Sequence, residues 1–186
     1  MKGTKVASRY AQSLLELAIE QNELDATYND ISLIYNTCVG ARDFSLFLKS
    51  PIIKPDLKRE TINKIFEGKV SKLTSAFVGL LVKKGREGIL EAVAKSFIDQ
   101  YKVHKNILTA EVTSVIEFDS DLNNRFATAL KDSTGKEIEL NNAIDKDLIG
   151  GFILRMDDKQ LDNSIKTQLK NIKKELLKPN ASYINN

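Results

Sequence analysis

The sequence predicts a mainly α-helical protein in which an N-terminal six-helix bundle is followed by a smaller C-terminal α+β domain. Apolar residues recur every three or four positions as far as about residue 105, and short runs rich in β-branched residues then take over. A length of 186 residues suits one large domain or two small ones. We therefore expect a bundle over 1–105, an α+β domain over 106–178 and a polar tail over 179–186.

The first three predicted helices each carry an apolar stripe. Over 5–20 the stripe residues are three or four positions apart, on one face of a helix: Val6, Tyr10, Leu14 and Leu17. A second stripe over 24–38 ends at Gly40, a typical helix terminator. A short helix over 44–48 stops before Pro51, because the residue that precedes a proline avoids the α conformation.

Three further helices complete the predicted bundle. Pro55 and Asp56 suit the first turn of the fourth helix, which continues to Gly68. The fifth helix, over 71–84, ends in two lysines and Gly85, which place cations at the negative end of the helix dipole and a glycine at the left-handed cap. The sixth helix is expected over 88–105. Short turns between all six favour a compact bundle.

Period-two patterning begins after residue 106. We expect a strand over 107–118, a helix capped by Ser120, and strands over 137–140 and 151–156. Asp157–Asp158 suits a hairpin turn that leads into a brief strand around 160–161. Either Asp162 or Asn163 is expected to cap the last helix, which carries an apolar stripe at 4-3-4 spacing: Ile165, Leu169, Ile172 and Leu176.

Composition and charge narrow the function classes. The net charge of +3 is too small for a dedicated polyanion binder. The charge is uneven: residues 1–105 carry 17 basic and 12 acidic residues and are net positive, whereas residues 106–186 carry 11 basic and 13 acidic residues and are net negative. One cysteine excludes an internal disulfide, and one cysteine with one histidine excludes a zinc site of the usual composition. The longest apolar run near the middle covers six residues, against about 20 for a membrane span.

Few residues suggest chemistry. His104 ends a basic helix and Cys38 continues an apolar stripe, so both are interpreted as structural. The glycines at 85 and 88 lack the lysine and hydroxyl residue of a phosphate-binding loop. We expect no catalytic residue, metal site or cofactor. One enzymatic alternative stays open: an unfamiliar site around His104 and Asp157–Asp158.

The C-terminal helix is rich in lysine. Four of these residues share one flank beside its apolar stripe: Lys166, Lys170, Lys173 and Lys174. No aromatic side chain lies between these lysines to stack on the bases of a nucleic acid. The pattern therefore favours a docking face for an acidic partner helix. The alternative is an RNA- or membrane-surface-binding module that uses this basic helix, whose binding should fall steeply with salt.

Several stretches together resemble the delta subunit of the bacterial F-type ATP synthase, which is similar to the mitochondrial oligomycin-sensitivity-conferring protein. The resemblance covers nearly the whole chain. Its most specific part is the glycine-pair strand LIGGFILR (148–155) together with the later DNSI (162–165). The other parts are the opening helix (6–14), the junction between the third and fourth helices (50–52 with Lys58) and the fifth helix with the turn that follows it (77–86).

The resemblance implies a non-catalytic peripheral-stalk (stator) subunit. In this family the N-terminal domain holds the N-terminal helices of the alpha subunits on the catalytic head, and the C-terminal domain meets the b subunits of the stalk. The head and stalk are thereby held against rotor torque, so that proton-driven rotation is coupled to ATP synthesis. Neither nucleic acid nor cofactor is implied, and the membrane is reached only through the complex.

Site residues follow from the same resemblance. The alpha-helix groove is implied between the first and fifth helices, with the following residues facing one another: Ala7, Tyr10, Ser13 and Leu14 against Phe77, Leu80 and Leu81. The C-terminal signature and stalk face are implied at Gly150, Gly151, Lys166, Lys170 and Lys173. No presequence precedes the motif at Val6, so we expect a peripheral location on the cytoplasmic face of the bacterial inner membrane.

Overall fold

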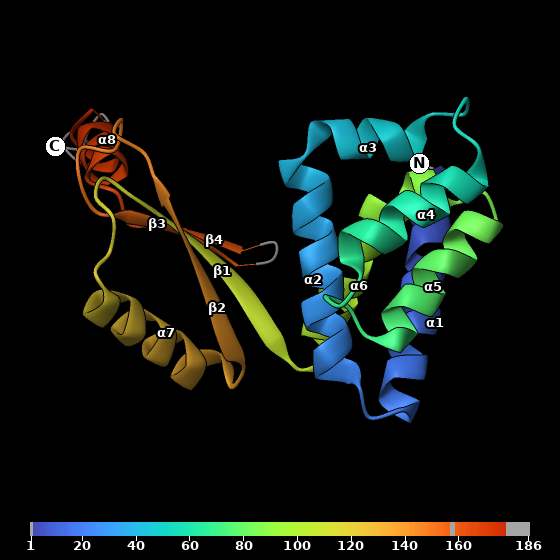
Figure 1. Cartoon of the computed structure of the whole chain (residues 1–186). Coiled ribbons are helices and arrows are strands. Elements are labelled where there is room, and N and C mark those ends of the chain that lie inside the picture. Colours follow the sequence, from blue (N-terminus) through green and yellow to red (C-terminus); the bar gives the residue numbers. More distant parts are fainter. Residues whose placement is uncertain (1, 157–158, 178–186) are drawn as a thin grey trace, which may run out of the picture. The chain divides into compact units, whose positions relative to one another are not determined.

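The computed structural model describes residues 2–156 and 159–177 and divides into two compact units between Lys105 and Asn106 (Figure 1). The described chain is mainly helical with one four-stranded sheet, which confirms the predicted class. Helices make up the first unit, and the sheet with two helices makes up the second.

The helices of the first unit begin and end close to the predicted positions. They are α1 (Lys2–Glu20), α2 (Leu24–Gly40), α3 (Arg42–Lys49), α4 (Pro55–Phe66), α5 (Lys72–Lys83) and α6 (Leu90–His104). The sixth starts later than predicted, because one 3-10 turn, η1 (Glu87–Ile89), precedes it. Helix α6 lies at the centre of the first unit, where it packs against both α1 and α2. Its residues Val93 and Phe97 are completely buried.

The second unit is built on the strand order β2-β1-β3-β4. Its elements are β1 (Ile107–Ser114), α7 (Ser120–Thr134), β2 (Glu137–Ile144), β3 (Phe152–Met156), β4 (Lys159–Asp162) and α8 (Ile165–Leu176). Because β1 and β2 are parallel, α7 is the crossover between them, whereas β3 pairs antiparallel with both β1 and β4.

Four details of the second unit differ from the predictions. β1 ends at Ser114 instead of residue 118, and β2 runs four residues further than expected. The cap of α7 is Asp119, whose side chain accepts from the Leu122 amide, and not Ser120. The cap of α8 is Ser164 and neither Asp162 nor Asn163, since the Ser164 hydroxyl accepts from the Thr167 amide. The predicted turn at 157–158 lies outside the described residues.

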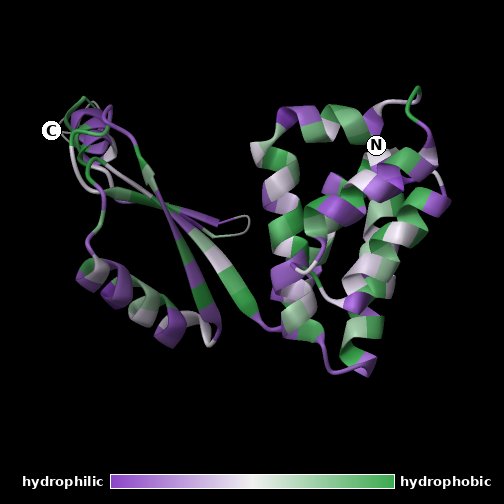
Figure 2. Ribbon diagram, in the orientation of Figure 1, coloured by the Kyte–Doolittle hydropathy of each residue, from purple (hydrophilic) through white to green (hydrophobic). Residues whose placement is uncertain are grey.

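One face of the sheet forms the core of this unit. Ala110, Val112 and Leu154 are buried there. The Phe126 ring of α7 lies 5.2 Å from the Phe118 ring and 5.0 Å from the Phe152 ring, between centroids. Hydrophobic and hydrophilic residues alternate along α7 (Figure 2), which is why it covers the sheet with one side only.

Candidate docking surfaces

A first candidate surface lies along α1 and α5. The Tyr10 and Phe77 rings meet edge to face with 6.5 Å between centroids, so side chains of α1 and α5 are in contact there. Figure 1 shows the two helices. Ser13 and Leu80 are exposed, the latter at 45%. These two residues are therefore accessible to another chain.

The remaining predicted residues of this surface face inward. Ala7, Leu14 and Leu81 are almost completely buried in the unit itself, so they support the surface from below. Two further accessible residues extend it and were not predicted to belong to this surface: Leu17 on α1 and Ala76 on α5. Their position at i+7 from Tyr10 and at i−4 from Leu80 is the signal that predicts them.

The start of α5 is held in place by α2. The Ser71 hydroxyl accepts from the Thr74 amide at 3.2 Å, the cap expected from a serine at this position. Asp30 of α2 accepts from the Ser71 amide and from the Thr74 hydroxyl, both at 2.8 Å. A single carboxylate therefore joins the two helices and fixes the N-terminal end of the surface.

In the second unit, Gly150 and Gly151 let the chain fold closely onto itself. Gly151 has φ +77, and a Cβ there would lie 2.3 Å from the Asn163 carbonyl oxygen. A Cβ at Gly150 would lie 2.7 Å from Ile165 Cδ1, and the Gly150 carbonyl accepts from the Ile165 amide. The glycine pair thus places the first turn of α8 against the start of β3.

A second carboxylate fixes the same turn. Asp162 accepts from the Ser164 amide at 3.0 Å and from the Thr167 hydroxyl at 2.8 Å. These hydrogen bonds, first those with Ser164, lower the pKa of Asp162 below its usual value. The first turn of α8 is held by Ser164 and Asp162 together.

The second candidate surface is the apolar stripe of α8. No residue of α8 is buried, and the stripe residues Leu169 and Ile172 are each 53% exposed. Lys166, Lys170 and Lys173 are exposed too. An amphipathic helix with an uncovered apolar stripe is typical of a site for another chain.

Two of the residues considered for catalysis, His104 and Cys38, lie in the part of the chain that the structure describes. His104 is exposed at the end of α6, beside a shallow hollow of about 440 Å³. Asp25 in that hollow is held by the Tyr101 hydroxyl (2.8 Å) and by the Lys105 ammonium (2.9 Å), and hydrogen bonds from Lys105 and Tyr101 lower its pKa. Burial, helped by the bond to Asp25, raises the pKa of Tyr101 to about 12.

Within the described residues, the thiol and the acidic side chains do not form a metal site. Cys38 is buried, and desolvation raises the pKa of its thiol to about 11, so it is protonated at neutral pH. Over residues 2–156 and 159–177, no three His, Cys, Asp or Glu side chains gather as metal ligands would. Within the same ranges no helix combines the length and the hydropathy needed to cross a bilayer. Asp157–Asp158 lies outside them.

Fold and surfaces together define a mainly helical protein of two units, each with an amphipathic helix face accessible to other chains. The sequence matches the family described as ATP synthase delta (OSCP) subunit over residues 6–176. The chain belongs to this family.

Individual relatives agree. The chain is 36% identical over 176 residues to ATP synthase subunit delta of Christiangramia forsetii, and this match covers 95% of each chain. It is 37% identical over 174 residues to the protein of the same name from Amoebophilus asiaticus, with 92% of this chain and 94% of that one covered. A chain in the cryo-EM structure of the Toxoplasma gondii mitochondrial ATP synthase hexamer shares the fold, with a TM-score of 0.71, 23% identity and coverage of 93% and 98%.

Proposed function

We propose that this chain is the peripheral-stalk subunit that links the catalytic head of an F-type ATP synthase to its b subunits. It catalyses no reaction itself. The first unit works as a six-helix bundle that grips the head, and the second grips the stalk. Because this chain joins the head to the stalk, the head does not turn with the rotor, and proton-driven rotation is coupled to ATP synthesis.

The α1–α5 surface is the proposed site for the N-terminal helix of an alpha subunit. Tyr10, Leu17 and Leu80 offer three partly exposed anchors, and burying each fully contributes up to about 1.5–3 kcal/mol. Association costs about 4–15 kcal/mol, so this surface alone gives a reversible contact. Ser13 stands beside the anchors as a small residue that lets a helix lie close.

The apolar stripe of α8 is the proposed site for the b subunits. Leu169 and Ile172 would pack against an amphipathic stalk helix, and Lys166, Lys170 and Lys173 would pair with its acidic residues. Gly150 and Gly151 take part indirectly, because they set the position of α8. Attachment through both units raises the effective concentration of each contact, so two modest interfaces act together as a durable link.

One observation carries the proposal: each of the two compact units leaves an amphipathic helix face uncovered. The proposal places the chain peripherally on the cytoplasmic face of the bacterial inner membrane, reached through the complex. Affinity purification of the tagged full chain from detergent-solubilised native membranes tests it. Alpha and b subunits should both co-purify; recovery of neither would overturn the proposal.

A further inference from the structure

The covalent link between the two units is very short. The first unit ends with α6 and Lys105, and β1 of the second unit begins at Ile107. Asn106 between them has φ +58, a left-handed conformation that stops a helix. Tension along the chain between the two units therefore enters the first unit at the last turn of α6.

One carboxylate ties this last turn to the first turn of α2. Asp25 of α2 accepts a hydrogen bond from the Tyr101 hydroxyl at 2.8 Å and forms an ion pair with the Lys105 ammonium at 2.9 Å. Tyr101 and Lys105 are four positions apart, so their side chains leave α6 on the same side. Because Lys105 is the last residue of the first unit, the Asp25 carboxylate holds the point at which the chain leaves that unit.

An aromatic pair packs at the same junction. The Tyr101 ring stacks on the Tyr28 ring of α2, with 4.0 Å between centroids and 18° between the ring planes. Tyr101 is only 8% exposed, whereas Val103 is 80% exposed and His104 is exposed too. Val103 and His104 therefore add little packing, and Tyr101 is the residue of this turn that is packed against α2.

We propose that Asp25, Tyr101 and Lys105 form a clasp that keeps the last turn of α6 folded when the second unit pulls on the chain. Without the clasp, tension unwinds α6 from its end, because terminal turns have the lowest local stability. Each residue that unwinds lengthens from about 1.5 Å to about 3.3 Å along the chain, so the link between the units becomes longer and looser. Asp25 is thus a positioning residue. The proposal rests on the proposed function only for the origin of the tension, which is the rotor torque between head and stalk.

Pulling single molecules of the full chain in optical tweezers tests the clasp. Handles are attached at Arg42→Cys on α3 and at Glu111→Cys on β1, two exposed positions between which the force runs through Asn106. The buried Cys38 is replaced by alanine in every version, so that only the introduced thiols react. The measured quantity is the rate at which the first unit opens at constant force.

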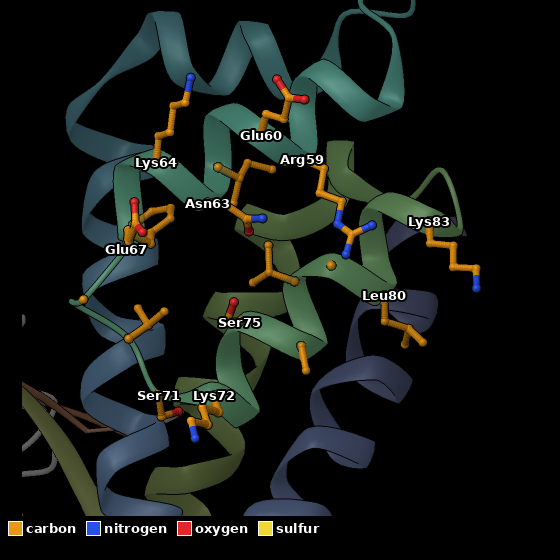
Figure 3. A pocket seen from close by; sticks show the side chains of 17 residues that line it. Arg59, Glu60, Asn63, Lys64, Glu67, Ser71, Lys72, Ser75, Leu80 and Lys83 are labelled. Atoms are coloured by element: carbon orange, nitrogen blue, oxygen red, sulfur yellow. The ribbon is translucent and has the colours of Figure 1, made fainter.

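A second pair of handles applies a force that does not run through the clasp. Lys64→Cys on α4 and Lys83→Cys on α5 lie on the two sides of a hollow between these helices (Figure 3). A residue that only stabilises the fold changes the opening rate in both pulling geometries. A clasp changes the rate chiefly in the first geometry, where the force passes through the end of α6.

Asp25→Ala should raise the opening rate about tenfold in the first geometry and by less than about twofold in the second. Asp99→Ala, which removes another exposed acid from α6, is the matched control and should change neither rate. Circular dichroism checks that each variant is folded before it is pulled.

Single contacts of the clasp can be removed one at a time. Tyr101→Phe keeps the aromatic stack but loses the hydroxyl, and Lys105→Met loses the ion pair, so each should raise the opening rate less than Asp25→Ala does. When both are combined, the further change Asp25→Ala should add nothing, because its two partners are already gone. Lys105→Arg should open at the rate of the unaltered chain, since a guanidinium also pairs with the carboxylate.

An unaltered opening rate for Asp25→Ala in the first geometry overturns the clasp. An equal rise in both geometries overturns it as well, because the carboxylate then makes an ordinary contribution to stability. The measurement uses this chain alone and is independent of co-purification with alpha and b subunits. Failure of the clasp therefore leaves the proposed function standing, and failure of co-purification removes the source of the tension without changing the opening rates.

Discussion

The ammonium of Lys58 lies 2.7 Å from Glu87 Oε1, and both side chains are nearly inaccessible, at 3% and 11% exposure. Lys58 also donates to the Leu48 carbonyl at 2.8 Å, at the end of α3. One lysine therefore joins α4, the end of α3 and the turn before α6. Within the described residues the second oxygen of Glu87 has no hydrogen-bond partner, so this carboxylate depends on Lys58.

Removal of the lysine charge should destabilise the first unit strongly. Lys58→Met leaves Glu87 buried without its counter-ion, and we expect the free energy of unfolding to fall by about 3–5 kcal/mol. Lys58→Met combined with Glu87→Leu should recover most of that loss, because no charge then stays buried. Urea denaturation followed by circular dichroism measures both. A loss below about 1 kcal/mol for the single variant would contradict the role given to the pair.

Gly151 should tolerate no side chain. Gly151→Ala combines a positive φ with a Cβ 2.3 Å from the Asn163 carbonyl oxygen, and a cost of about 2–5 kcal/mol is expected. Gly135→Ala is the matched control, since φ there is +67 and a Cβ meets nothing within 4 Å. Thermal unfolding of the two variants isolates the clash. Equal losses would mean that backbone conformation alone explains the glycine.

The first turn of α8 should loosen in acid. The pKa of Asp162 is lowered in the folded state, so its stabilising contribution is present above the ordinary value of 3.8 and is lost as the pH falls through the lowered folded value. The protection factor of the Thr167 amide, which corrects for the intrinsic pH dependence of exchange, should therefore fall below about pH 4. In Asp162→Asn the amide oxygen still accepts hydrogen bonds but does not titrate, so this acid dependence should disappear, whereas Asp99→Asn on α6 should retain it.

A charge on the apolar stripe of α8 should affect assembly and not folding. Leu169 is 53% exposed, so Leu169→Asp is expected to change the free energy of unfolding by less than about 0.5 kcal/mol. Retention of the b subunits on the tagged chain should nevertheless fall about tenfold or more. Asn171 is also exposed on α8, so Asn171→Asp is the matched control that adds the same charge outside the apolar stripe. Unchanged retention in Leu169→Asp would exclude the stripe as the stalk site.

Helical periodicity and punctuation predicted the elements well, because those signals are local. Pro55 at the start of α4 and Gly85 after α5 lie where a local rule puts them. The caps of α7 and α8 were each missed by one or two residues, since several neighbouring side chains there can cap and tertiary geometry selects one. β2 was predicted too short because its last four residues depend on pairing with β1.

The functional surfaces were less predictable for a physical reason. Leu14 and Leu17 belong to one apolar stripe, yet the first is buried and the second exposed, because neighbouring helices decide which side of a stripe is covered. The pairing of Lys58 with Glu87 spans 29 positions and leaves no local pattern.

Simultaneous attachment at both units is the central claim, and coupling in native membranes tests it most directly. Strains carry the full chain with Ser13→Arg on the α1–α5 surface, Leu169→Asp on α8, or both, and ATP hydrolysis and ATP-driven proton pumping are measured side by side. We expect each single variant to keep hydrolysis by the head but to lose much of its pumping, and the double variant to lose nearly all of it. Pumping at the unaltered level in the double variant, with the protein folded and present, would contradict it.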